Sequence, residues 1–181
     1  MNMLALAART ALRLGESAAA ASHLDAVRTR LLDSFDVARV LRIGSQTRGT
    51  AIRSYSDLDL LVVLRRNEAK WGKRIVSSHT LLARVKEDLQ ARFSHTDIRS
   101  DQQAAVISFS QGQQSLDVVP ALFGDFSGNR PVYSIPDGDG GWLETSPEAH
   151  NRLFQGANSR SRSKLAGLCR LIREHSGNPV L

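Results

Sequence analysis

Residues 44–64, which read GSQTRGTAIRSYSDLDLLVVL, contain the two features that decide how this chain folds. The stretch opens on a Gly-Ser pair in a glycine-bearing turn, and it closes on an apolar run. Two aspartates, Asp57 and Asp59, stand one residue apart where that run begins. Two interpretations compete: a site for phosphate and metal, or a loop and a strand whose polar ends are simply solvated.

The run DLDLLVVL at residues 57–64 predicts a β-strand whose apolar second half is typical of a strand covered on both faces. Successive side chains of a strand point to opposite faces, so Asp57 and Asp59 are expected to project from the same face. Two carboxylates this close repel each other, and without a cation one of them would be driven toward its protonated form. The pair therefore predicts a divalent-metal site, and oxygen ligands favour Mg²⁺ or Mn²⁺ over zinc.

A third carboxylate, Asp117, stands alone among apolar residues in SLDVVPAL, which predicts another strand. An aspartate is costly to bury there unless a metal or a cationic group accompanies it. Sites in which two metal ions handle triphosphates usually need a further carboxylate. We therefore expect Asp57, Asp59 and Asp117 to be catalytic residues and ligands of shared metal ions.

The glycine turn ahead of the first strand predicts a complementary site for anions. Gly44 lets the backbone approach a ligand closely, and the Ser45 hydroxyl can donate a hydrogen bond to a phosphate oxygen. The turn at Arg48, Gly49 and Thr50 is expected to present free N–H groups at a helix start. An anion cradle beside a cation site can position and neutralise phosphates, which is most of what catalysis of phosphoryl or nucleotidyl transfer requires.

Each motif on its own has an ordinary structural explanation. A Gly-Ser turn is weak evidence, and an Asp-x-Asp pair at a strand start can be surface decoration because aspartate is common beside turns. Both motifs in this order, followed by an isolated aspartate in a strand, favour a functional site. The basic residues Arg160, Arg162 and Lys164 leave two alternatives open: a solvated helix face, or contact with a triphosphate.

The composition is typical of a globular protein with a basic surface. Of the 181 residues, 41% are hydrophobic and 23% are charged, and no apolar run is long enough to span a bilayer. Arg9, Arg13 and Glu16 interrupt the apolar centre that a signal peptide would need. We therefore expect a cytoplasmic protein that does not contact a membrane. The formal net charge of +6 favours a polyanionic partner, either nucleic acid or nucleoside triphosphates.

Hydrophobic periodicity predicts an α+β fold with a mixed sheet rather than a doubly wound one. Helices are expected at residues 5–35, 68–93 and 157–175, and strands at 38–44, 57–64, 95–101, 104–111 and 114–122. The last three strands are expected to form a meander, and residues 48–53 a helical turn. Further expectations concern Ser22 as the cap of a second helical segment, packing roles for Trp71 and Trp142, and a helix that begins at Pro147 behind a Ser146 cap.

The order G-S-x-x-R-G-T, then S-D-x-D-L, then x-D-V-V-P-A, followed by a Trp and a helix that Ser-Pro initiates, resembles a known family. It is similar to the nucleotidyltransferase core of bacterial cyclic-oligonucleotide synthases, the CD-NTases or SMODS-type nucleotidyltransferases of the DNA polymerase β-like superfamily. The resemblance spans roughly residues 25–175. The three-part motif indicates the superfamily, and the DVVPA context of Asp117 together with WLETSPEAHNRLF favours this branch.

The resemblance implies a role for each motif residue. Gly44 and Ser45 would hold the β- and γ-phosphates of the donor nucleotide. Asp57 and Asp59 would bind both Mg²⁺ ions. Asp117 would bind the metal that activates the acceptor ribose hydroxyl, which attacks the α-phosphate and expels pyrophosphate.

Lys164 lies where similar proteins have a helix with a basic residue near the triphosphate, so the nucleotide-binding candidates are Gly44, Ser45, Arg48 and Lys164. The resemblance also implies three parts: an N-terminal helical segment packed on the core (1–35), a catalytic core (36–145) and the start of a helical C-terminal lobe (146–181). Family members usually continue further into that lobe. We therefore expect a fragment, a truncated gene product or a reduced member.

Three functional hypotheses follow. The first is Mg²⁺-dependent synthesis of a cyclic or linear oligonucleotide messenger from nucleoside triphosphates, as the resemblance to anti-phage signalling enzymes implies, with a nucleic acid or a protein as candidate activator. The second is a stand-alone nucleotidyltransferase that modifies a protein or a tRNA end, as in toxin–antitoxin pairs, with the same three aspartates. The third is an inactive fragment that binds nucleotide or nucleic acid through its basic surface.

Overall fold

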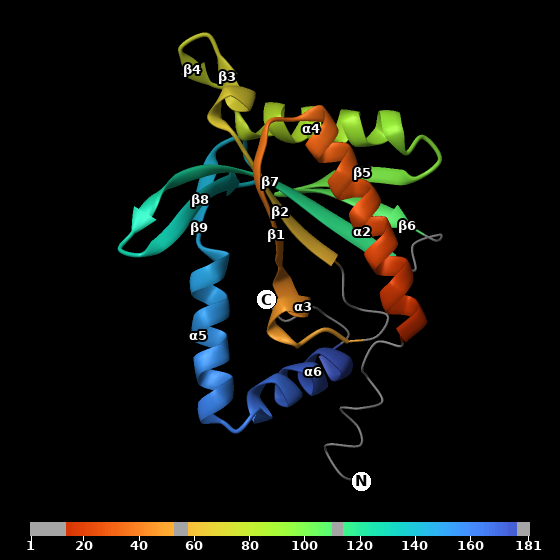
Figure 1. Ribbon diagram of the computed structural model, residues 1–181, viewed down its shortest axis with the longest axis vertical. Helices are drawn as coiled ribbons and strands as arrows, with labels where there is room; N and C mark the ends of the chain where they lie inside the picture. The colour runs from red at the N-terminus through yellow and green to blue at the C-terminus, as the bar shows by residue number, and fades with distance from the viewer. Residues whose placement is uncertain (1–13, 53–57, 110–113, 177–181) are drawn as a thin grey trace.

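A seven-stranded mixed sheet forms the centre of the fold, with helices against one face and further helices beyond one end (Figure 1). The computed structural model describes residues 14–52, 58–109 and 114–176. The strands of this sheet are β1 (Val37–Ile43), β2 (Leu58–Leu64), β5 (Asp97–Asp101), β6 (Ala104–Phe109), β7 (Gln114–Ser127), β8 (Arg130–Pro136) and β9 (Trp142–Thr145). The α-helices are α2 (Leu14–Ser34), α3 (Gly44–Arg48), α4 (Ser78–Arg92), α5 (Pro147–Arg160) and α6 (Lys164–Ser176).

The strand pairing confirms the predicted α+β mixed sheet. The order is β1-β2-β7-β6-β5, with β8 beside β7 and β9 beside β8. β2 and β7 run parallel, whereas the other pairs in this sheet are antiparallel, including the predicted meander from β5 to β7. β7 runs beyond the predicted end at residue 122 through an irregularity between Phe123 and Asp125. Residue 57 and residues 110–111 of the predicted strands lie outside the described residues, as do residues 5–13 of the helix predicted at 5–35.

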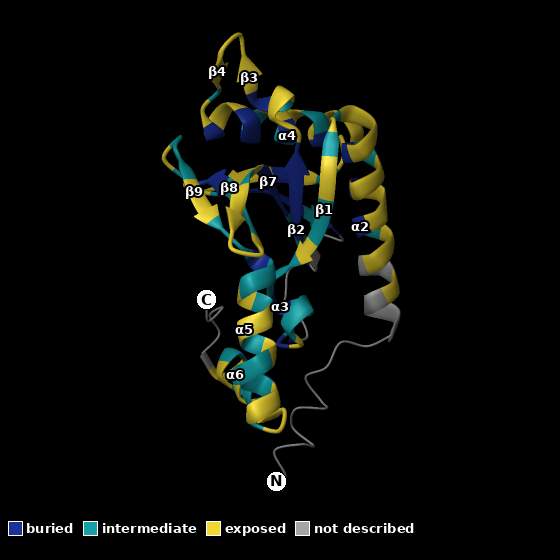
Figure 2. Ribbon diagram, turned by 60° about the vertical axis from the view of Figure 1, so that its left-hand side comes forward, coloured by how far each residue is buried: buried dark blue, intermediate teal, exposed yellow. Residues whose placement is uncertain are grey.

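Strand β2 is buried on both faces, as its continuous apolar run predicts (Figure 2). Leu60 and Val62 share a core with residues of α2 and α4. Leu61 and Val63 point the other way, into a second buried cluster on the opposite face. Asp59 lies on the same face as this second cluster, because it stands two residues before Leu61 in β2. Asp117 lies on this face as well, because it stands two residues before Val119 in β7.

Helices α2 and α4 cover the first face with side chains spaced about one helical turn apart. Their buried apolar residues are Leu24, Val27 and Leu31 on α2, and Leu81, Leu82, Val85 and Leu89 on α4. Steps of three and four residues bring such side chains onto one side of a helix. Burying an aliphatic side chain completely stabilises a fold by roughly 1.5–3 kcal/mol. Hydrophobic burial therefore holds these two helices on the sheet.

The helix predicted at residues 68–93 is wrong over its first part. Residues Arg66–Ala69 form a 3₁₀ turn, and β3 (Lys70–Trp71) then pairs with β4 (Arg74–Ile75) in a small hairpin. Gly72 supplies the left-handed backbone, with φ of 60°, that this tight turn requires. Ser77 caps α4 by accepting a hydrogen bond from the backbone N–H of Thr80. Trp71 is 82% exposed on the hairpin, so its predicted packing role is also wrong.

Three further expectations about helices need correction. Ser22 lies inside the continuous helix α2 and does not begin a second segment. The helix predicted at 157–175 is two helices, because α5 continues to Arg160 and α6 begins only at Lys164. Pro147 does begin α5, but the Ser146 side chain makes no capping hydrogen bond. Among the described helices, none has the length and apolar character needed to cross a membrane.

Candidate active site

Parallel pairing of β2 with β7 brings two of the predicted carboxylates together. Asp59 and Asp117 are register partners, so their side chains leave the sheet on the same face. Neighbouring strands lie about 4.8 Å apart, which sets the spacing of the two Cα positions. Both residues are half-buried, and the Oδ1 atom of Asp117 is shielded from solvent. Two carboxylates at this spacing repel each other unless a positive charge lies between them.

Gly44 lies directly against the Asp59 carboxylate. The end of β1 pairs with the start of β2 through Ile43 and Asp59, which places the following glycine beside this side chain. A Cβ atom added at Gly44 would overlap the carboxylate of Asp59, and the φ of +74° also favours glycine. The sequence motif therefore has a steric reason: the backbone must pass close to the acidic group.

The Gly-Ser pair begins the one-turn helix α3, which corrects the predicted helical turn at 48–53. Ser45 is buried in this turn. Gly49, with φ of 69°, ends the helix in the left-handed conformation typical of a C-terminal cap. Its backbone N–H donates to Gln46 O at 3.3 Å, and that of Thr50 donates to Ser45 O at 2.9 Å. The expectation of free N–H groups at Arg48, Gly49 and Thr50 is therefore wrong for the last two, since this turn ends a helix.

The sequence matches a known family over most of its length. Residues 7–158 match the Second Messenger Oligonucleotide or Dinucleotide Synthetase (SMODS) domain. The chain belongs to this family. The resemblance that its three motifs indicate is therefore confirmed.

Individual relatives of this SMODS domain agree with the family. A probable cyclic nucleotide synthase of Bacillus cereus is 24% identical, with a match covering 77% of this chain and 50% of the relative. The cyclic AMP-AMP-AMP synthase of Escherichia coli is 26% identical, over 77% of this chain and 42% of the relative. The solved CdnE cyclic dinucleotide synthase of Elizabethkingia meningoseptica, with GTP and Apcpp, shares the fold at a TM-score of 0.68 and 15% identity, over 84% of this chain and 57% of that chain. This chain thus spans about half the length of the curated relatives it matches.

The remaining predicted site residues of the SMODS domain lie in different places. Asp57 lies outside the described residues. Arg48, at the far end of α3 from Gly44, lines a pocket of about 380 Å³ between α3, α5 and α6. Lys164 is exposed at the first position of α6. The structure thus places Gly44 against Asp59 and Asp59 beside Asp117, with Ser45 next to Gly44 in the chain. The nucleotide and metal contacts predicted for these residues, and for Arg48 and Lys164, stay predictions.

Two arginines that the sequence did not single out connect α6 to the end of α3. Arg170 donates from Nη1 to the backbone oxygen of Gly49, and Arg173 donates from Nη1 to that of Thr50 at 3.3 Å. Cations suit these positions because carbonyl groups at a helix C-terminus carry partial negative charge. The signal in the sequence was the spacing of three within LCRLIRE, which places both guanidinium groups on one side of a helix.

Two carboxylates among the described residues of the SMODS domain are suitable ligands for a hard divalent cation. Carboxylate oxygens are the ligands that Mg²⁺ and Mn²⁺ prefer, and Asp59 and Asp117 present them side by side. Over the described ranges, no three His, Cys, Asp or Glu side chains gather into a metal-binding group. Asp57, the third predicted ligand, lies outside those ranges. The site therefore offers two acidic groups beside a glycine backbone that a phosphate chain could approach.

Proposed function

We propose that this SMODS domain is a Mg²⁺-dependent nucleotidyltransferase that joins nucleoside triphosphates into a cyclic or linear oligonucleotide messenger. The observation that carries the proposal is the register pairing of Asp59 with Asp117 directly beside Gly44. Family membership supports it, and two relatives are named as synthases of cyclic nucleotides. We extend the proposal to a cytoplasmic role in anti-phage signalling, which the family resemblance supports.

The proposed reaction assigns one task to each group. The acceptor ribose oxygen attacks the α-phosphorus of a donor triphosphate, and the bond to the leaving pyrophosphate breaks. Asp59 and Asp117, with Asp57, would hold Mg²⁺, which when bound would neutralise charge on the phosphates and the attacking oxygen. Gly44 lets the triphosphate approach the carboxylates because it has no side chain there. Ser45 and the first turn of α3 would orient the phosphates.

A product assay tests this proposal. The full chain is incubated with Mg²⁺ and nucleoside triphosphates labelled at the α-phosphate, and pyrophosphate and labelled products are separated. We expect a free labelled oligonucleotide from the wild type and none from Asp59→Asn, while Asp101→Asn on the exposed edge strand β5 serves as the matched control. Equal pyrophosphate release from the wild type and Asp59→Asn would contradict the proposal. Label transferred to a protein or a tRNA would instead favour the modifying type of nucleotidyltransferase.

A further inference from the structure

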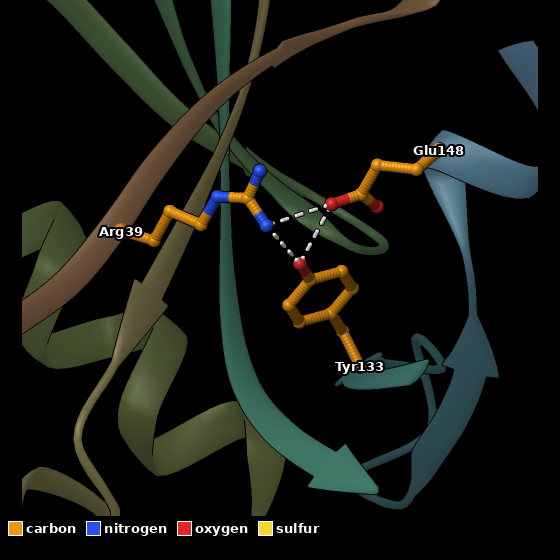
Figure 3. Close-up of polar contacts among 3 residues, drawn as sticks. All are labelled: Arg39, Tyr133 and Glu148. Carbon is orange, nitrogen blue, oxygen red and sulfur yellow. Dashed lines mark hydrogen bonds and ion pairs between the residues drawn. The ribbon is translucent and has the colours of Figure 1, made fainter. Parts of the chain in front are cut away.

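Three polar side chains from distant parts of the sequence meet where α5 leaves the sheet (Figure 3). Arg39 on β1 donates from Nη1 to the Tyr133 hydroxyl on β8 at 3.0 Å and to Glu148 Oε1 in the first turn of α5 at 2.9 Å. The Tyr133 hydroxyl donates to the same Glu148 oxygen at 2.9 Å. Each member of this Arg39–Tyr133–Glu148 cluster therefore contacts both others.

The cluster is anchored in the core through Tyr133, which is 2% exposed. Burial, followed by the adjacent Glu148 carboxylate, raises the pKa of the Tyr133 hydroxyl above its ordinary value, so the hydroxyl stays protonated and able to donate. Hydrogen bonds to an ionised partner are about twice as strong as those between neutral groups. The second Glu148 oxygen, Oε2, is shielded from solvent and has no hydrogen-bond partner among the described residues. Loss of the Oε1 contacts would therefore leave Glu148 without the described hydrogen bonds that offset the shielding of its Oε2 atom.

Hydrophobic burial does little to hold α5 and α6 in place. Among the side chains that the structure describes, α5 buries only Pro147 and α6 buries only Ala166. Large apolar residues on these helices stay exposed, including Leu153 at 64% and Leu168 at 50%. The orientation of α5 relative to the sheet therefore depends more on polar contacts than the orientations of α2 and α4 do.

The polar contacts continue from α5 and α6 to α3. Asn151 stands three residues after Glu148, and its Oδ1 atom lies 3.3 Å from the Thr47 hydroxyl of α3. The α6 arginines, Arg170 and Arg173, bind the carbonyl groups that follow α3. The opposite end of α3 is Gly44 against Asp59. A displacement of α5 would consequently move the turn that faces the carboxylates.

We propose that the Arg39–Tyr133–Glu148 cluster positions α5 on the sheet and thereby holds α3 in place beside Asp59. Its members are positioning residues, since the hydrogen bonds that the structure describes for them join them to one another and not to α3 or to Asp59 and Asp117. The consequence for nucleotide binding rests on the proposed nucleotidyltransferase function. The mechanical part, the immobilisation of α3, does not depend on that function.

Amide hydrogen exchange over residues 44–50 of the full chain tests the mechanical part. Tyr133→Phe keeps the buried ring and removes the hydroxyl, and Glu148→Gln keeps the side-chain shape and removes the charge. We expect both to accelerate exchange across these residues by roughly threefold or more. The matched control is Asp88→Asn, because Asp88 accepts two hydrogen bonds from Arg30 at 3.0 and 2.5 Å and connects α2 with α4 on the other face. The control should leave residues 44–50 unchanged, and unchanged exchange there in both cluster variants would overturn the proposal.

Calorimetric titration with Mg²⁺ and α,β-methylene ATP tests the consequence for binding. We expect Tyr133→Phe and Glu148→Gln to raise the dissociation constant roughly threefold to tenfold while the proteins stay folded. Faster exchange over residues 44–50 with wild-type affinity would overturn the link to nucleotide binding. A wild type that binds no nucleotide would count against the proposed function itself, and the exchange data would still decide whether the cluster positions α3.

Discussion

The helices of this fold are attached to the sheet in two different ways. On one face of the sheet, α2 and α4 contribute a row of buried aliphatic residues to a large core. Helices α5 and α6 lie beyond one end of the sheet, and among the described residues they are attached through arginines, a tyrosine and Glu148. Figure 2 shows α5 and α6 largely intermediate or exposed, in contrast to the buried strand β2. The side of the sheet that α2 and α4 cover provides stability, whereas the end toward α5 and α6 carries the candidate chemistry and is held by specific contacts.

The largest effect is expected at the paired carboxylates of Asp59 and Asp117. Asp117→Asn keeps the size of the side chain but removes a charge that would hold Mg²⁺. Turnover should fall on the order of 10³-fold or more, while the melting temperature stays close to that of the wild type. Initial rates of pyrophosphate release and a thermal melt measure the two quantities. A folded variant with wild-type turnover would exclude a role for Asp117 in catalysis.

Shortening a buried side chain of α2 should have the largest effect on stability. Leu31 is fully buried between α2 and the sheet, so Leu31→Ala should lower the free energy of unfolding by about 2–5 kcal/mol. The matched change on α5 is Leu153→Ala, whose side chain is 64% exposed, and it should change stability by no more than about 0.5 kcal/mol. Urea unfolding compares them, and equal losses would show that α5 is held by burial after all.

Alanine substitutions at the two glycines at the ends of α3 distinguish a steric clash with Asp59 from backbone strain alone. Gly44 and Gly49 have φ of +74° and +69°, so an alanine at either costs roughly 1–2 kcal/mol in the left-handed region. Gly44→Ala also forces Asp59 aside, whereas a Cβ at Gly49 meets open space. We expect Gly44→Ala to destabilise more and to abolish nucleotide binding, with Gly49→Ala retaining it. Urea unfolding and titration with α,β-methylene ATP measure both, and equal behaviour of the two variants would exclude the close approach at Gly44.

The smallest effect concerns pH and Tyr133. Its pKa is raised above 10.0 in the folded protein, so the protonated hydroxyl is favoured by folding. The resulting stability is fully present below the unfolded pKa and is lost as the pH rises through the folded pKa. In urea unfolding from pH 8 to pH 11, the wild type should therefore lose more stability at the alkaline end than Tyr133→Phe. Parallel curves would show that burial and the Glu148 carboxylate do not raise the pKa of the Tyr133 hydroxyl in solution.

The sequence predicted the sheet and its carboxylates because both leave local patterns. A continuous apolar run identifies β2, and a lone aspartate among apolar residues identifies β7 and its acidic position. Their parallel pairing was not readable from either strand, but a mixed sheet of the expected type provides it. This much of the site follows from alternation and burial alone.

The errors arose where two structures share one pattern. Trp71 and Ile75 fall near the helical spacing of the later α4 residues, yet the Gly72 turn folds them into a hairpin. Gly49 suggested a helix start, whereas its left-handed backbone ends α3. Single-sequence periodicity does not distinguish these cases, because the deciding property is the backbone angle at one glycine.

The contacts that hold α5 had no signal in the sequence. Arg39 and Glu148 are 109 positions apart, and Arg39 and Tyr133 are 94 apart. Neither separation belongs to a helix, a hairpin or a motif. Such contacts can be identified only from the folded structure, in which β1, β8 and α5 lie close together.

The exposed hairpin of β3 and β4 gives this protein a convenient optical property. The chain has two tryptophans. One of them, Trp71, is almost fully hydrated at the hairpin, whereas Trp142 is partly buried against the core at the start of β9, shortly before α5. The first should emit at longer wavelength and be quenched readily by iodide, and the second should be protected. Intrinsic fluorescence can thus follow loosening near the α5 attachment without any dye, with the hairpin indole as an internal reference.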